Sequence, residues 1–234
     1  MLKGCLNGGR RRDEHAAVPV TPAELAADAV RCAGSGVAAV HVHPRDAAGV
    51  ESLAPAVIAA AVTAIRAARP GLPVGVSTGA WIAPDPAARV AAVRAWTVLP
   101  DFASVNAHEP GATAVAAALH ERGVMVEAGL WTVAAVDAWR RWSVPTGRVL
   151  VECLAEEPDA ALTVAAAILA ALPAGGPPVL LHGEGPATWP VLAEAVRRGL
   201  DTRIGLEDTL VLPDGRPAPD NAVLVAAARS LGAR

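Results

Sequence analysis

The sequence contains no tyrosine and a single phenylalanine, Phe102, and its other aromatic side chains are six tryptophans. A tyrosine hydroxyl is therefore excluded as an acid or base in any reaction of this chain. Cysteine is scarce as well: Cys5, Cys32 and Cys153 form no C-x-x-C pair and leave an odd number. Disulfides are not expected from such a set. Because each cysteine falls in an apolar strand-like or helix-like run, we expect buried structural thiols.

Long runs of charged or of apolar residues are also missing. The formal net charge of -3 is close to balance, so nothing points to nucleic acid or an anionic membrane as a partner. Alanine-rich stretches such as residues 54–68 are interrupted by proline, threonine or arginine and fall short of the roughly 20 apolar residues that a membrane span requires. The first residues lack the layout of a secretory signal. We therefore expect a cytoplasmic protein.

What the sequence does contain is an alternation of short β-rich runs and longer Ala/Leu/Val-rich segments, which is the pattern of a parallel sheet with helical crossovers. With 53% hydrophobic residues over 234 positions, the chain can bury a sizeable core. Eight strands are expected, at residues 2–6, 37–42, 73–76, 102–105, 124–126, 148–151, 178–181 and 202–204. Their spacing fits one strand, one helix and two loops per unit.

Helix-capping signals support the same count. Thr21-Pro22-Ala23-Glu24 places a threonine cap, an early proline and a glutamate at the third helical position, which together form a capping box. Gly34, Gly123 and Gly199 each follow a helical run and are expected to stop it.

Eight such units predict a (β/α)8 barrel, or TIM barrel, that forms a single domain over residues 1–234. The competing fold is an open, doubly wound sheet, which normally carries a glycine-rich phosphate turn after its first strand. Asn7-Gly8-Gly9 is too short a match to argue for that turn.

A TIM barrel places its catalytic residues at the carboxyl ends of its strands. Hydrogen-bonding or ionisable residues follow every expected strand: Asn7, His41 with His43, Ser77 with Thr78, Asn106, Glu127, Glu152, His182, and Glu207 with Asp208. Random placement of polar residues would not give this concentration. We therefore expect the functional site at that end of the barrel.

The pair His41-Val42-His43 is the most informative motif within this set. In an extended strand, residues two apart point to the same face, so both imidazoles can reach one ion. A carboxylate from another strand can complete a three-ligand set that leaves a position open for substrate, as in catalytic zinc sites. Alone, the pattern is weak and also fits a strand that ends in solvent. The polar residues at the other strand ends favour the metal site.

The whole chain resembles the β-keto acid cleavage enzymes, a family that includes the 3-keto-5-aminohexanoate cleavage enzyme. The motifs that carry the resemblance are Leu6-Asn7-Gly8, Pro19-Val20-Thr21-Pro22-Ala23-Glu24, His41-Val42-His43 with Arg45-Asp46, Ser77-Thr78-Gly79, Ser104-Val105-Asn106 and Arg203-Ile204-Gly205-Leu206-Glu207-Asp208. The last of these is the most specific. The resemblance implies a zinc-dependent (β/α)8 barrel that reacts a β-keto acid with acetyl-CoA and releases acetoacetate and a new CoA ester.

Position by position, the resemblance implies that His41, His43 and Glu207 bind Zn²⁺, and bare chemistry agrees, because two histidines and a glutamate form a known catalytic zinc set. It also implies that Asp208 is the general base and that Arg203 pairs with it and keeps it ionised. Ser77 and the Thr78-Gly79 segment are expected to hold the substrate carboxylate. Further substrate contacts are expected from Asn7, Asn106 and Glu127.

The chain departs from the family in the loop after the first strand. Where the 3-keto-5-aminohexanoate cleavage enzyme has a glutamate that binds a substrate ammonium, this chain has Arg10, followed by Arg11 and Arg12. A neutral or anionic substrate is then expected, and Arg10 can pair with a second carboxylate at its far end. Alternatively, the three arginines form only a solvated basic turn.

Other interpretations remain open. A zinc aldolase or an amidohydrolase on the same barrel also uses an H-x-H pair, although the amidohydrolase places it on the first strand and adds two later histidines and an aspartate. His108 and His182 are the histidines available for that purpose, and their roles and that of Glu152 stay open. A catalytically idle barrel is the third possibility. The resemblance also implies a homo-oligomer, either a dimer or a tetramer.

Overall fold

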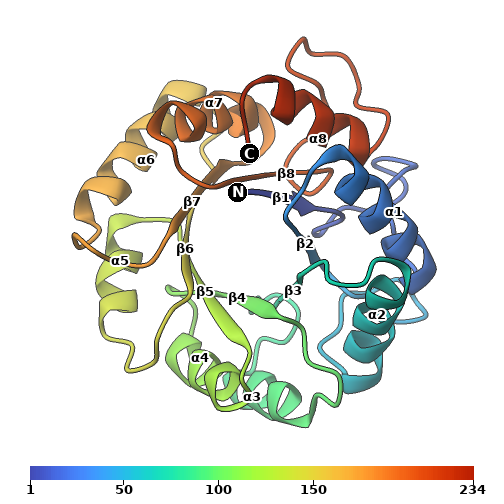
Figure 1. Ribbon diagram of the computed structural model, residues 1–234. Helices are drawn as coiled ribbons and strands as arrows, with labels where there is room; N and C mark the ends of the chain where they lie inside the picture. Colours follow the sequence, from blue (N-terminus) through green and yellow to red (C-terminus); the bar gives the residue numbers. More distant parts are fainter.

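The computed structural model describes residues 1–234 and confirms the TIM barrel: a ring of parallel strands surrounded by a ring of helices (Figure 1). The strands are β1 (Leu2–Cys5), β2 (Ala39–Val42), β3 (Val74–Ser77), β4 (Phe102–Asn106), β5 (Met125–Leu130), β6 (Arg148–Cys153), β7 (Val179–Gly183) and β8 (Thr202–Ile204). The helices are α1 (Pro22–Ser35), α2 (Pro55–Ala68), α3 (Pro86–Ala95), α4 (Ala112–Glu121), α5 (Val133–Arg140), α6 (Pro158–Ala171), the 3-10 helix η1 (Gly185–Ala187), α7 (Thr188–Arg198) and α8 (Asn221–Ser230).

Neighbouring strands pair in parallel from β7 through β1 to β8, in chain order apart from the last step. The ring closes between β7 and β8, where Leu180 and Asp201 form a single parallel bridge and the N–H of Leu181 donates to the carbonyl of Asp201 at 2.9 Å. All strands therefore end at the same rim, which brings their carboxyl-terminal residues together.

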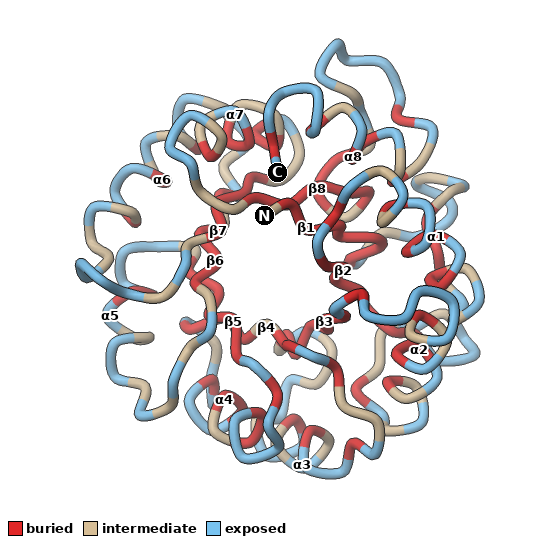
Figure 2. Tube along the Cα trace, in the orientation of Figure 1, coloured by how far each residue is buried: buried red, intermediate tan, exposed pale blue.

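The outer faces of the strands pack against the helices. Val40, Val42, Val74 and Val76 are fully buried, and they belong to the same apolar cluster as Leu25, Ile58 and Ile65 on the inner faces of α1 and α2. Figure 2 shows buried residues along the strands and on the helix sides that face them. None of the helices is both long and apolar enough to cross a membrane.

The helix ends follow the expected chemistry with one exception. Thr21 and Glu24 form the capping box at the start of α1, and Gly199 ends α7 with φ 68°. Gly34, however, lies inside α1, and the helix stops two residues later at Gly36, whose φ of 105° is a left-handed conformation that favours glycine.

The three cysteines are free and buried, as expected, and burial raises the pKa of the Cys153 thiol to about 12.

The expected end of the fifth strand at Val126 is wrong, because β5 continues to Leu130. Glu127 consequently lies inside the barrel with no exposed surface, where Lys3 Nζ contacts both of its carboxylate oxygens at 2.5 and 2.7 Å. Arg148 adds a contact of 2.7 Å, and Lys3 also lies over the ring of Phe102. A buried carboxylate needs such partners, so this cluster fills the barrel interior and Glu127 does not reach the rim.

Candidate functional site

A cavity of about 320 Å³ opens at the carboxyl ends of the strands. It is lined by most of the residues expected at the site: Arg10, His41, His43, Ser77, Asn106, Glu152, Arg203 and Glu207. The lining is predominantly polar; its hydrophobic members are Trp81, Trp131 and Leu150. This placement fits the rule that TIM-barrel sites form at this rim.

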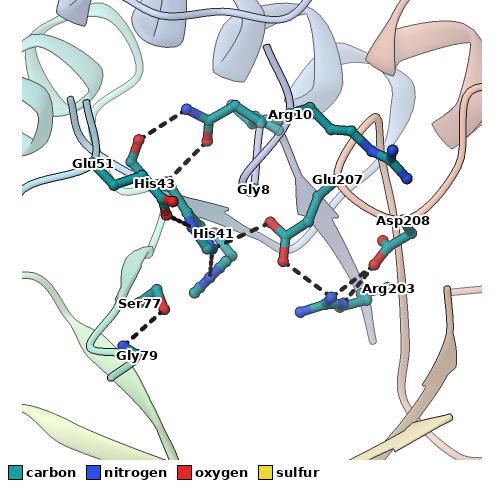
Figure 3. Close-up of polar contacts among 12 residues, drawn as sticks. Gly8, Arg10, His41, His43, Glu51, Ser77, Gly79, Arg203, Glu207 and Asp208 are labelled. Carbon is teal, nitrogen blue, oxygen red and sulfur yellow. Dashed lines mark hydrogen bonds and ion pairs between the residues drawn. The ribbon is translucent and has the colours of Figure 1, made fainter. Parts of the chain in front are cut away.

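His41 on β2 and His43 just beyond it point to the same face, as residues two apart in a strand should. Their Nε2 atoms lie 3.2 Å apart, and Glu207 Oε2 lies 3.7 Å from Nε2 of His43 (Figure 3). One ligand atom from each of the three residues lies within 4.8 Å of the others. Two imidazoles and one carboxylate so arranged are able to hold a metal ion.

Two further observations fit a metal at this place. Glu207 Oε2 is buried and has no hydrogen-bond partner, which is costly for a carboxylate oxygen unless a cation satisfies it. Burial, and then the proximity of His43, lowers the pKa of His41 well below its usual value, so that imidazole is neutral at neutral pH. A neutral imidazole is the form that binds a metal.

His43 is held in place by residues that the sequence patterns did not single out. Glu51 contacts Nδ1 of His43, and Trp81 stacks on its ring with centroids 6.2 Å apart and an interplanar angle of 17°. Trp81 also donates its Nε1–H to Glu51 at 3.3 Å. Glu51 follows a turn after β2 and folds back beside Arg45, so no strand or helix periodicity could have placed it at the site.

Arg203, on β8, bridges two carboxylates. Its Nε and Nη2 lie 2.9 and 2.7 Å from Asp208 Oδ1, and Nη2 lies 3.0 Å from Glu207 Oε1 (Figure 3). Asp208 has no exposed surface and does not line the cavity, which it adjoins through Arg203 and Glu207. Burial raises the pKa of Asp208 well above its usual value, and Arg203 offsets only part of that rise.

His182, on β7, lies between Asp208 and Glu152. Its Nε2 is 3.4 Å from Glu152 Oε2, and its Nδ1 is 3.9 Å from Asp208 Oδ1. Burial and then Arg203 lower the pKa of His182, so the ring is neutral at neutral pH. Burial alone would raise the pKa of Glu152, but His182 and Arg203 lower it to about 2.

His108, by contrast, is exposed and packs on Trp131.

The Ser77-Thr78-Gly79 segment is only partly available to a ligand. Ser77 lines the cavity, and its Oγ accepts from the N–H of Gly79 at 3.3 Å. Thr78 is fully buried and donates its hydroxyl to the carbonyl of Ser104 at 2.7 Å, so it supports the loop rather than facing the cavity. A Cβ at Gly79 would lie 2.3 Å from the ring of Trp81, so glycine allows that tryptophan to reach His43.

Asn106, at the end of β4, lines the cavity and donates Nδ2–H to Glu109 at 2.9 Å. Glu109 also accepts from the N–H of Ala80 at 2.9 Å and pairs with the buried Arg89 at 2.6 Å. This glutamate therefore braces both Asn106 and the loop that carries Trp81. It lies in a loop before α4, where no sequence pattern indicates its contacts.

Arg10 reaches the cavity, whereas the two arginines after it do not line it. Its guanidinium lies 3.1 Å from Glu14 and 3.9 Å from Glu184, both of which also line the cavity. Arg11 and Arg12 pair with Asp13 and Glu24 on the surface. The basic turn thus supplies one cavity residue, whose charge Glu14 partly balances.

Asn7 was expected to contact substrate, but it does not line the cavity. Its Nδ2 donates to the carbonyl of His43 and its Oδ1 accepts from the N–H of His43, both at 2.9 Å. Both ends of the amide are therefore used to fix the backbone of a candidate metal ligand. Glu127 lies elsewhere, deeper in the barrel.

Known structures share this fold. ObcA in its complex with oxaloacetate superposes with a TM-score of 0.69 at 18% identity, over 92% of this chain and 63% of ObcA. The chain thus spans less than two thirds of ObcA. The type I 3-dehydroquinate dehydratase of Clostridium difficile gives a TM-score of 0.65 at 10% identity, over 98% of this chain and 92% of that chain. Likeness at these identities shows the fold alone.

Comparison of the sequence with known proteins gives a more specific result. No protein of curated function matches it. The family model described as beta-keto acid cleavage enzyme, however, matches residues 1–234, which is the entire sequence. The chain therefore belongs to the β-keto acid cleavage enzyme family.

Proposed function

We propose that the protein is a zinc-dependent enzyme that reacts a β-keto acid with acetyl-CoA and releases acetoacetate and a new acyl-CoA. The observation that carries the proposal is the convergence of His41, His43 and Glu207 on one cavity that also presents Ser77 and Asn106. Membership of the family supports the cleavage of a β-keto acid. The choice of zinc and of acetyl-CoA is the finer part of the proposal.

The proposed reaction balances without an outside oxidant or reductant. The bond between the keto carbon and the adjacent CH₂ of the β-keto acid breaks, and the acyl group that is released ends as a thioester of CoA. The two-carbon unit that carries the carboxylate forms a new carbon–carbon bond to the acetyl carbon of acetyl-CoA, which gives acetoacetate. Proton transfers to and from carbon therefore require a base that reaches the reacting carbon directly or through one water.

His41, His43 and Glu207 would hold the zinc, and three protein ligands leave a position open for a substrate oxygen. When bound, zinc supplies a Lewis acid that draws electron density from the keto oxygen. The donor set of two imidazoles and one carboxylate suits zinc better than magnesium or calcium, which prefer oxygen ligands alone.

Asp208, which adjoins the cavity through Arg203 and Glu207 without lining it, is proposed as the general base that acts through one intervening water. Burial raises its pKa, and a carboxyl group with a raised pKa is a stronger base than one in water. Its Oδ2 is buried without a partner and so has the capacity to take up a proton. Arg203 holds the other oxygen of Asp208 and links it to Glu207, so the base and the candidate metal ligand keep a fixed separation.

The carboxylate of the substrate would be held by the Ser77 hydroxyl and the Asn106 amide, which face the same cavity. We further propose that the substrate is neutral or carries a second carboxylate toward Arg10, because a guanidinium disfavours an ammonium group. ObcA has been described with oxaloacetate, itself a β-keto acid with two carboxylates. At 18% identity that likeness concerns the fold, so the substrate proposal rests on Arg10.

The direct test is quantitation of zinc in the purified protein, followed by a screen of β-keto acids with acetyl-CoA for the release of acetoacetate. The proposal predicts acetoacetate only when both substrates are present, and a matching acyl-CoA in equal amount. Zinc-loaded protein that forms no acetoacetate from any β-keto acid in the screen would contradict it.

A further inference from the structure

We propose that Asn221, the first residue of α8, is a positioning residue for the candidate metal centre, although it lies outside the cavity. Its amide holds the backbone beside Glu207 against the end of β1. Asn7, two residues past the end of β1, holds the backbone of His43 in turn. The two asparagines thus set the separation of two ligands before any metal binds. The inference rests on the proposed metal centre.

Both polar atoms of the Asn221 side chain, Oδ1 and Nδ2, form hydrogen bonds. Oδ1 accepts from the N–H of Leu206 at 2.6 Å, and Nδ2 donates to the carbonyl of Leu6 at 2.8 Å and to Asp28 Oδ2 at 2.6 Å. The residue has no exposed surface. Because a carbonyl and a carboxylate can only accept, and a backbone N–H can only donate, these partners allow a single orientation of the amide.

The junction that Asn221 fixes is unusually close. A Cβ at Gly205 would lie 1.8 Å from the carbonyl oxygen of Cys5 and 2.8 Å from Oδ1 of Asn221. Only glycine lets the end of β8 approach the end of β1 in this way. The N–H of Glu207 then donates to the same Cys5 carbonyl at 3.4 Å, so the backbone of the ligand itself lies against β1.

The segments that carry the candidate ligands are therefore both hydrogen-bonded to the same two residues, Leu6 and Asn7. The carbonyl of Leu6 accepts a hydrogen bond from Nδ2 of Asn221, and the N–H of Leu6 donates to the carbonyl of His41 at 3.0 Å. Asn7 bonds the backbone of His43 in both directions. A metal ligand set needs its donor atoms placed to within a fraction of an ångström, and preorganised backbone contacts of this kind provide that precision.

Neither aspartate nor alanine satisfies the same partners. Aspartate lacks the two N–H donors and would place a second carboxylate against Asp28. Alanine would leave the N–H of Leu206 and the carbonyl of Leu6 buried without partners. Either change should let the segment that carries Glu207 move away from β1. Removal of outer partners of a metal ligand typically weakens metal binding about 10- to 100-fold, and we expect a loss of that size here.

The test compares Asn221→Asp with Asp220→Ala. Asp220 caps α8 through the N–H of Val223 at 2.9 Å but does not contact Leu206 or Leu6, so its variant weakens the helix alone. Circular dichroism establishes that each variant folds, and competition with a chromophoric chelator gives the dissociation constant for Zn²⁺. We expect about 10- to 100-fold weaker binding for Asn221→Asp and unchanged binding for Asp220→Ala. Equal affinities in wild type and Asn221→Asp, or equal losses in both variants, would overturn the proposal.

A second measurement, on metal-free protein, keeps the inference separate from the proposed function. Hydrogen exchange of the Leu206 amide should be slow in wild type and Asp220→Ala and much faster in Asn221→Ala, which removes the oxygen that accepts from this N–H. Where the aspartate variant does not fold, Asn221→Ser, which puts a single hydroxyl in place of the amide, takes its place with a smaller expected effect. A wild type that binds no zinc would refute the proposed function, while the exchange of Leu206 would still decide the role of Asn221.

Discussion

Glu51 contacts Nδ1 of His43, while Nε2 of the same ring faces Glu207. The two nitrogens thus have separate partners, and the carboxylate fixes which of them carries the proton. In metal sites a carboxylate at the second nitrogen orients the ring and makes the ligating nitrogen more basic. The arrangement is therefore that of a metal ligand prepared in advance, and it leads to the first prediction.

Replacement of Glu51 by glutamine should weaken zinc binding about 10- to 100-fold, because the amide keeps the size of the side chain but loses its charge. Trp81→Phe is a matched control, since it retains a ring over His43 and removes only the bond from Nε1 to Glu51. Its affinity should change much less. Zinc titration of both variants with a competing chelator measures the difference. Equal affinities for wild type and Glu51→Gln would show that Glu51 does not tune His43.

Asp208→Asn tests the proposed base. The substitution preserves shape and removes basicity, so turnover should fall by about two to four orders of magnitude, the usual contribution of a positioned general base. Zinc should remain bound, because Asp208 is not among the three candidate ligands. Steady-state kinetics together with metal analysis separate the two effects. A variant of full activity would eliminate Asp208 as the base.

Arg10 should determine which β-keto acids are accepted. Among neutral, aminated and carboxylated substrates of equal length, the carboxylated one should have the highest kcat/KM, and Arg10→Ala should reduce that preference by about tenfold or more. Arg11→Ala is the control, because Arg11 is exposed and pairs with Asp13. Preference for the aminated substrate, or an Arg10→Ala variant with unchanged preference, would show that Arg10 does not determine substrate specificity.

Glu24 should make folding stability depend on pH below neutrality. Arg12, followed by the N–H groups at the start of α1, lowers the pKa of Glu24 from 4.5 to about 2. A group with a lowered folded-state pKa stabilises the fold above its unfolded pKa, and this contribution is lost as pH falls from 4.5 toward 2.

Urea unfolding of wild type and Glu24→Gln measures this contribution at two pH values. Near pH 6 wild type should be more stable by about 1 kcal/mol, a value discounted for the solvent exposure of the pair. The difference should shrink as the pH falls through the range between the two pKa values. A constant difference across that range would mean that the ionised carboxylate does not contribute.

The barrel was predictable because its signals are local. Apolar runs of strand length, the capping box at Thr21 and the polar residues after each strand are all read along the chain. His41 and His43 could be paired from the two-residue period of a strand. The shared rim of the parallel strands allowed a carboxylate to complete the set, and the resemblance to the β-keto acid cleavage enzymes indicated that this carboxylate is Glu207.

The remaining site residues escape such signals for a physical reason. Glu51, Glu109 and Asn221 come from a turn, a loop and a helix start, and their contacts depend on tertiary packing that no periodicity encodes. The sequence pattern misplaces Glu127 because a fully buried strand has no alternation to mark its end, so the expected fifth strand is too short. Its partner Lys3 could not be identified from spacing alone.

The most direct test of the account is the metal content and cleavage activity of wild type beside His41→Ala. His41 lies at the rim and outside the apolar clusters that hold the barrel, so the variant should fold. The account predicts one zinc per chain in wild type, and loss of both zinc and acetoacetate formation in His41→Ala. Two metals per wild-type chain, or cleavage of β-keto acids by a folded His41→Ala protein without bound metal, would contradict it.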